Sequence, residues 1–156
     1  MEKLMQQNVD SGVKAMGLVT VTKTNKFGEV TDKFEVPNLV VDAGKIYIAG
    51  KMIAEALDTP VHMSHMGIGT GTASPAGGDT SLGTQTGRVL LSGNLQDTNS
   101  ITYTATFPAG TGTGAITEAG VFNASSGGTM LCRTVFSVVN KQAGDTIAVT
   151  WKVTVS

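Results

Sequence analysis

Cysteine is almost absent from this chain of 156 residues, in which Cys132 stands alone. A single cysteine excludes an intrachain disulfide, and with it the class of small secreted domains that disulfides hold together. Long apolar runs are also absent: no stretch approaches the ~20 apolar residues that a membrane-spanning helix needs. The first twelve residues, MEKLMQQNVDSG, lack the apolar core of a signal peptide. We therefore expect a protein made in a reducing, soluble compartment, with no membrane partner.

Charge is scarce too. Charged residues make up 15% of the chain and the net charge is -1, whereas soluble domains usually carry about 25% charged residues. The eleven Lys and Arg residues are scattered along the chain, and duplex binding depends on clustered ones. We therefore expect no nucleic-acid partner. Few charges on a soluble protein also indicate that much of its surface meets other protein.

The polarity that is present comes from Thr, Ser, Gly and Asn, and this composition favours strands and turns. Residues 16–36 predict two strands around a turn with Asn25 and Gly28. Pro37 then ends the second strand or marks a sheet edge. Alternating or apolar runs predict further strands at 87–95, 100–107, 115–122, 129–139 and 146–156. Short strands at intervals of about 8 to 12 residues predict an antiparallel β-sandwich or barrel.

One segment is typical of a helix, at about residues 42–57. Asp42 is the expected N-cap, and apolar residues recur at steps of three and four to form one face: Ile46, Ala49, Ile53 and Ala56 or Leu57. We expect this helix to pack on the sheet or to cap one end of it. Residues 1–15 have no clear period and predict an extended N-terminal arm, which leaves 16–156 as a single β-sandwich domain.

The only two histidines, His62 and His65, are three residues apart and raise the question of a metal site. On a predicted strand, positions three apart point to opposite faces. A zinc site also needs three or four ligands, and no Cys, Glu or third His lies nearby. We therefore expect no metal ligands here, with one histidine packed inside and the other at an interface or in solvent.

The sequence GIGTG, at residues 67–71, raises the separate question of a phosphate cradle. A dinucleotide fingerprint would need a third glycine where Ser74 stands, followed by a helix. Pro75, Gly77 and Gly78 follow instead, and a similar string recurs at Gly110 to Gly114 between two predicted strands. We therefore expect a strand that exits through glycines into a long exposed loop reaching Arg88, and no bound cofactor.

Catalytic groups form no recognisable constellation, so we expect no enzyme activity and no catalytic residues. Cys132 shares parity with Met130 and Phe136 and predicts a buried small hydrophobe. Glu118 shares parity with Ile116 and Phe122, so it faces inward and needs a partner. Arg133 on the next strand is one candidate for that partner and Arg88 is the other, in a structural ion pair that fixes strand register.

Three segments carry a family resemblance: HMSHMGIGTGTASPAGGDTSLGTQTGRVLL, ITYTATFPAGTGTGAITEAGVFNASSGGTMLCRTVF and the closing WKVTVS. Together they resemble small virion structural proteins of tailed bacteriophages, and distantly the amino-terminal module of phage tail-collar fibre proteins. The shared order is a glycine strand exit, a spacer ending in Arg, an alternating strand, an EaGlF segment, a glycine turn and a strand. The resemblance spans about residues 38–156, and residues 115–136 are its most specific part.

The resemblance implies a non-enzymatic structural component of a tailed-phage virion, made in the host cytoplasm. A collar fibre protein continues into a shaft, whereas this chain stops at Ser156 directly after its last strand. We therefore favour a capsid decoration (cement) protein that binds the major capsid protein, with homo-oligomer formation as the default. A tail, neck or baseplate component that binds a tail or baseplate protein is the first alternative. A glycan-binding module is the second.

Overall fold

The computed structural model describes residues 12–52 and 61–156, and within them the chain is mainly β with one helix. This confirms the predicted fold class. Residues 1–11 of the predicted arm and 53–57 of the predicted helix lie outside the described residues, and Ala15 is already the first residue of a strand. The elements are β1 (Ala15–Thr24), β2 (Val30–Val40), α1 (Asp42–Gly50), β3 (His65–Gly69), β4 (Gln85–Leu90), β5 (Gly93–Asp97), β6 (Ser100–Phe107), β7 (Gly114–Phe122), β8 (Met130–Lys141) and β9 (Thr146–Val155).

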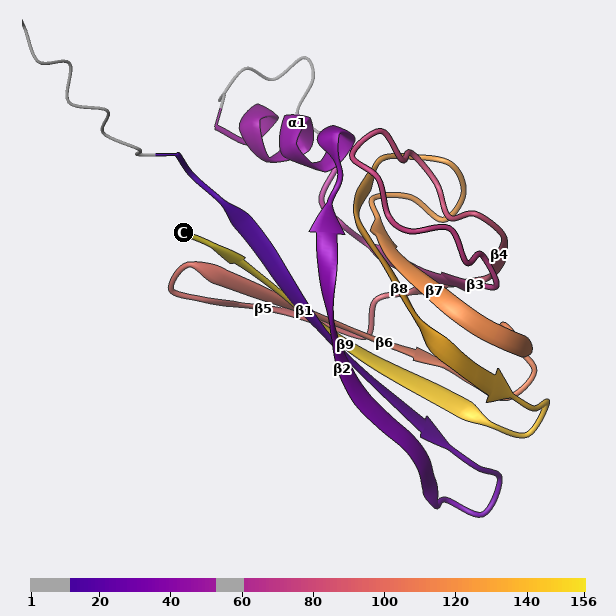
Figure 1. Cartoon of the computed structure of the whole chain (residues 1–156). Coiled ribbons are helices and arrows are strands. Elements are labelled where there is room, and N and C mark those ends of the chain that lie inside the picture. Colours follow the sequence, from indigo (N-terminus) through magenta and orange to yellow (C-terminus); the bar gives the residue numbers. More distant parts are fainter. Residues whose placement is uncertain (1–11, 53–60) are drawn as a thin grey trace, which may run out of the picture.

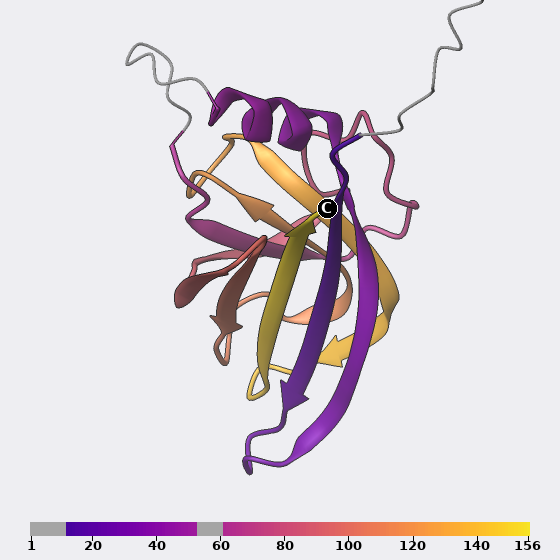
Figure 2. The ribbon, with the colours of Figure 1, turned by 90° about the vertical axis from the view of Figure 1, so that its left-hand side faces the viewer.

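All nine strands belong to one antiparallel sheet, in the order β4-β3-β7-β8-β2-β1-β9-β6-β5, which curls into a half-barrel (Figure 1). The sheet has two parts, a five-stranded leaf (β2, β1, β9, β6, β5) and a four-stranded leaf (β8, β7, β3, β4). The leaves are joined at only two registered pairs, Leu39 with Arg133 and Val40 with Cys132. Figure 2 shows the long β1, β2 and β9 side by side, with α1 across one end of the fold.

The chain crosses between the two edges of the sheet at Leu91 and Ser92. Sequence analysis predicts one strand over 87–95, and this is wrong: β4 and β5 are separate strands at opposite ends of the strand order. Leu91 N–H donates to Ser64 O beside β3, and Ser92 N–H donates to Thr104 O on β6. Because adjacent residues bond next to β3 and to β6, the strands beside the two edge strands, the two edges must lie close together, which requires the sheet to curl.

The core fills the inside of this curl, with side chains from both leaves. Along β9 the residues alternate as the sequence predicts, and Trp151 is fully buried at the centre of its strand. Thr150 and Lys152 point to the outer side. Trp151 and Phe107 from one leaf and Ile68 and Ile116 from the other belong to one cluster. A second, smaller cluster contains Val41, Leu82, Phe122 and Met130. The larger cluster therefore joins the two leaves.

Helix α1 lies on the fold with a different face from the predicted one. Ile46 is 73% exposed and Ala49 is exposed, whereas Gly44 is buried and Tyr47 and Ile48 pack on the core. Gly44 decides this orientation, because a Cβ there would collide with the backbone carbonyl of Leu131 on β8. The periodicity predicted a helix here, but it could not show that Gly44, which has no side chain, selects the buried face.

Two local predictions at β2 and α1 need correction. Asp42 is the first helical residue and pairs with Lys45, while Val41 is the N-cap and makes no side-chain capping bond. Pro37 does not end β2 but lies within it, opposite Leu18. Its missing N–H is tolerated because β2 pairs with β8 only from Leu39 onward, so Pro37 does mark an unpaired edge.

Candidate functional site

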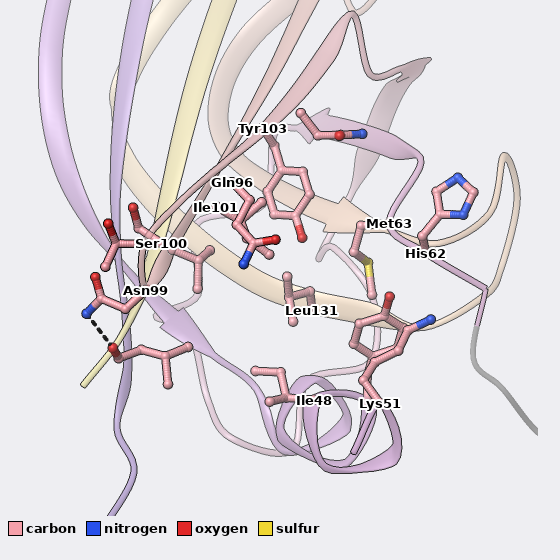
Figure 3. A pocket seen from close by; sticks show the side chains of 15 residues that line it. Ile48, Lys51, His62, Met63, Gln96, Asn99, Ser100, Ile101, Tyr103 and Leu131 are labelled. Atoms are coloured by element: carbon pink, nitrogen blue, oxygen red, sulfur yellow. Dashed lines mark hydrogen bonds between the residues drawn. The ribbon is translucent and has the colours of Figure 1, made fainter. Parts of the chain in front are cut away.

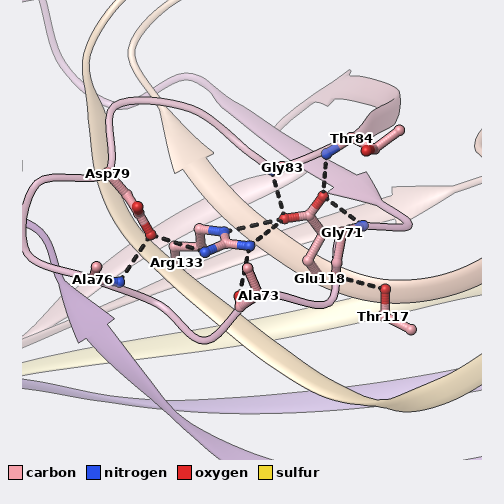
Figure 4. Close-up of polar contacts among 9 residues, drawn as sticks. All are labelled: Gly71, Ala73, Ala76, Asp79, Gly83, Thr84, Thr117, Glu118 and Arg133. Carbon is pink, nitrogen blue, oxygen red and sulfur yellow. Dashed lines mark hydrogen bonds and ion pairs between the residues drawn. The ribbon is translucent and has the colours of Figure 1, made fainter.

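Glu118 on β7 and Arg133 on β8 form a buried ion pair, with Arg133 Nη2 2.9 Å from Glu118 Oε2 (Figure 4). Glu118 is fully buried, but on the face of its leaf opposite the core inside the curl. It shares this face with Phe122 and not with Ile116 as predicted, because the register shifts between Ile116 and Glu118. Arg133 rather than Arg88 is its partner. Arg133 Nη1 also contacts Asp79 Oδ2 at 2.8 Å. Its Nη2 donates to the carbonyl of Ala73 at 3.1 Å. Arg133 therefore connects β7 to the loop of residues 70–84.

The Glu118 carboxylate also accepts hydrogen bonds from three backbone N–H groups of that loop. Gly71 and Thr84 donate to Oε1 at 2.9 and 2.7 Å, and Gly83 donates to Oε2 at 2.9 Å. Burial by itself raises the pKa of Glu118, but the Thr84, Gly83, Arg133 and Gly71 donors outweigh it and hold the pKa below its usual value. The carboxylate is therefore ionised and fully hydrogen-bonded at neutral pH.

Two glycines of GIGTG, Gly69 and Gly71, are required because a side chain at either position would collide with Glu118. A Cβ on Gly71 would lie 2.5 Å from Glu118 Oε1, and one on Gly69 would meet the same oxygen at 2.6 Å and collide with the carbonyl of Thr84. Backbone N–H groups do form an anion cradle here, as the sequence pattern suggested, but the anion is the chain's own carboxylate. The loop predicted as simply exposed is therefore anchored at Glu118, and Arg88 lies within β4 rather than at the loop's end.

The two histidines lie in different types of local structure. Only His65 is on a strand, the first residue of β3, so the prediction of both on one strand is wrong; His62 lies in the irregular segment before it and is exposed. His65 Nδ1 is 2.8 Å from Ser64 Oγ. Within residues 12–52 and 61–156, no group of three or more His, Cys, Asp or Glu side chains could hold a metal ion.

Cys132 and Arg88, which the sequence analysis also named, are both engaged in packing or hydrogen bonds within the fold. Cys132 is fully buried, as predicted, and burial raises the pKa of its thiol far above the usual value. Arg88 lies over the Phe122 ring, 3.6 Å from its centroid. It also donates through Nη1 to the carbonyls of Ala124 and Gly127 at 3.0 and 2.9 Å. Arg88 thus fastens the β7–β8 turn to β4.

The open end of the half-barrel holds a cavity of about 730 Å³, between α1 and the ends of β5, β6 and β9 (Figure 3). Its volume lies within the range of about 300–1,000 Å³ that is common for ligand pockets. Apolar side chains line part of the cavity: Ile48, Met63, Ile101, Leu131, Val153 and Val155. Three side-chain amides from the β5–β6 hairpin also line it: Asn94, Gln96 and Asn99.

The two tyrosines of this cavity do not offer free ring faces. Tyr103 is only 7% exposed, and its burial raises the pKa to about 12, with Tyr47 and Cys132 nearby contributing. The Tyr47 ring has the Lys51 ammonium 5.3 Å from its centroid. Sequence analysis missed this cavity, although the alternation of β5 places Asn94 and Gln96 on one face. The arrangement can hold apolar groups inside and hydrogen-bond polar groups at the amides.

Comparison with family models, with curated proteins and with solved structures finds no match to this chain. Among the residues that the structure describes, no helix has the length and apolar character needed to cross a membrane.

Proposed function

We propose that this chain is a non-enzymatic structural component of a tailed-phage virion, and that it decorates the head by binding the major capsid protein. The observation that carries the proposal is the outer face of the five-stranded leaf, which we call the Thr-rich face. Its threonines come from three strands: Thr20, Thr22, Thr102, Thr104, Thr106, Thr150 and Thr154. Such a face suits a broad contact with another protein.

Strand register shows how continuous this face is. Leu95 pairs with Thr102, and Thr102 pairs with Lys152. Lys152 pairs with Leu18, and Leu18 pairs with Pro37, so one row crosses all five strands. Directly paired residues lie on the same side of an antiparallel sheet. The row therefore presents two exposed leucines, a threonine and a proline with a single charge.

The size of the Thr-rich face fits a specific protein contact. Five strands at a spacing of about 4.8 Å span about 24 Å, and eight residues at about 3.4 Å each span about 27 Å. The product, about 650 Å², approaches the ~800 Å² per partner of a standard interface. On a capsid lattice the same contact is repeated many times, so each copy braces neighbouring subunits with modest affinity.

Quantitative mass spectrometry of purified virions tests the proposal. We expect the chain in hundreds of copies per particle, in proportion to the major capsid protein. Absence from purified particles would refute a virion role altogether. A few or tens of copies would instead support the alternative, a tail, neck or baseplate component bound to a tail or baseplate protein.

A glycan-binding module is less well supported by the cavity. Sugars usually stack on aromatic rings, but Tyr103 is nearly buried and Lys51 lies over the Tyr47 ring. The virion proposal places the chain in the particle after synthesis in the host cytoplasm, with self-association into a homo-oligomer.

A further inference from the structure

We propose that the cavity at the open end of the half-barrel, lined by Met63, Leu131 and the β5–β6 amides, binds the N-terminal residues 1–11 of a second copy of this chain. The proposal is independent of the virion role, because it concerns how two copies of the isolated chain associate.

The chemistry of the cavity selects a peptide. Its apolar part takes aliphatic side chains, and Figure 3 shows Met63, Ile101 and Leu131 around the same space as Tyr103. The side-chain amides of Asn94 and Gln96 can each donate and accept a hydrogen bond, which matches the N–H and C=O groups of a peptide backbone. A sugar would lack a free aromatic face here, because Tyr103 is nearly buried and Lys51 lies over the Tyr47 ring.

Two observations indicate that residues 1–11 are the peptide that binds: the position of the start of β1 and the sequence that precedes it. Ala15, at the start of β1, pairs with Val155, which lines the cavity. The eleven residues before Gly12 can span up to about 36 Å when extended. They carry apolar side chains at Met1, Leu4, Met5 and Val9, and the flexible methionine side chain adapts well to irregular apolar spaces.

The described residues next to this segment favour a second copy over the same copy. Lys14 is held in extended pairing, because its N–H and C=O both bond to Ser156, at 2.6 and 2.8 Å. Val13 is 76% exposed and does not line the cavity. A chain that leaves β1 in this extended direction would have to reverse before it could enter its own cavity. Reciprocal exchange between two copies needs no reversal and closes a symmetric pair.

The first test compares full-length variants by light scattering after size-exclusion chromatography over a range of concentrations. Leu4→Glu with Met5→Glu should weaken dimerisation roughly 100-fold, as expected for the loss of two buried apolar side chains. Gln6→Glu with Gln7→Glu, which adds the same charge two positions along, should leave the dimer intact. In the cavity, Gln96→Trp should block dimerisation, whereas Leu95→Trp on the opposite face of β5 should not.

The second test identifies whose segment is bound. One copy carries Leu4→Cys and another carries Asn94→Cys, so a disulfide between the new cysteines can form only between copies; the native Cys132 is buried. We expect that disulfide on mild oxidation of the mixture. The proposal is overturned if the wild-type chain is monomeric at every concentration, or if its dimer survives both the Leu4/Met5 and the Gln96 variants. It is also overturned if the disulfide forms only when both cysteines are in one chain.

Discussion

Gly71→Ala provides a sharp test of the idea that the glycines of residues 67–71 exist to cradle Glu118. The added Cβ would lie 2.5 Å from Oε1, 2.7 Å from Cδ and 2.9 Å from Oε2 of that carboxylate. All three contacts are shorter than real Cβ atoms tolerate. The carboxylate cannot move aside, because Arg133 and three backbone N–H groups hold it. The loop must therefore move, and the Gly71 N–H bond to Oε1 is lost.

The expected cost follows from the bonds that a loop shift breaks. A hydrogen bond to a charged group contributes about 1.5–3 kcal/mol. Loss of the Gly71 bond, with weakening of its neighbour from Thr84, therefore predicts about 3 kcal/mol of destabilisation. For a chain of this size, 1 kcal/mol lowers Tm by about 2–4 °C, so Tm should fall by about 6–12 °C.

Gly78→Ala is the matched control, since it lies in the same loop and a Cβ there meets nothing within 4 Å. It should be neutral or slightly stabilising, by up to about 1 kcal/mol, because alanine restricts the unfolded chain. Urea unfolding followed by circular dichroism gives both free energies. If Gly71→Ala lies within about 0.5 kcal/mol of Gly78→Ala, the cradle does not constrain the loop and the reasoning is wrong.

Three further predictions concern the Glu118 carboxylate, helix α1 and the Thr-rich face. The hydrogen bonds that lower the pKa of Glu118 and Asp79 contribute stability above the unfolded pKa of about 4; this stability is lost as pH falls through the folded values, so urea midpoints should drop in acid. Glu118→Gln should cost about 3–5 kcal/mol at neutral pH and reduce that acid dependence, and an unchanged pH profile would contradict the assignment. Gly44→Ala should destabilise by about 1–3 kcal/mol despite the higher helix propensity of alanine, because the Cβ meets Leu131; a gain in Tm would contradict this contact. Thr102→Arg on the Thr-rich face should change stability by less than about 0.5 kcal/mol yet reduce the copies per virion, whereas Ser125→Arg, on the β7–β8 turn, should leave copy number unchanged.

Alternation predicted the strands well wherever one face is buried and the other is not. β9 follows the pattern along most of its length and β6 follows it from Tyr103 onward, although Ile101 is exposed. The β1–β2 hairpin turns at Asn25 with Gly28 at φ +83°, as its turn residues suggested. The method failed at 87–95, where β4 and β5 belong to different edges of one sheet. Local pattern cannot show that break, because it depends on which distant strands bond to Leu91 and Ser92.

Of the two candidate sites, the Glu118–Arg133 pair could be predicted from the sequence and the cavity could not. The sequence placed Arg133 within reach of Glu118, because the two lie on neighbouring strands whose order is local in sequence. Parity with Ile116 failed to give the face of Glu118, because the register shifts between these two residues. The cavity could not be predicted, because it forms where α1, the segment before β3 and the β5–β6 hairpin meet. Its residues are far apart along the chain, and no single one of them has an unusual neighbourhood in the sequence.

This chain suggests a general criterion for deciding whether a glycine-rich loop after a strand binds a phosphate. Backbone N–H groups in such a loop can donate hydrogen bonds to any anion, and a phosphate is only one possibility. A buried acidic residue whose partner strand lies beside the loop is another. Here the acid is Glu118, which β3 meets directly, since Gly69 pairs with it across the sheet. An internal carboxylate that is already ionised and fully bonded leaves the N–H groups no capacity for an external phosphate. A glycine ladder should therefore be tested for an internal acid on the adjacent strand before a nucleotide site is inferred.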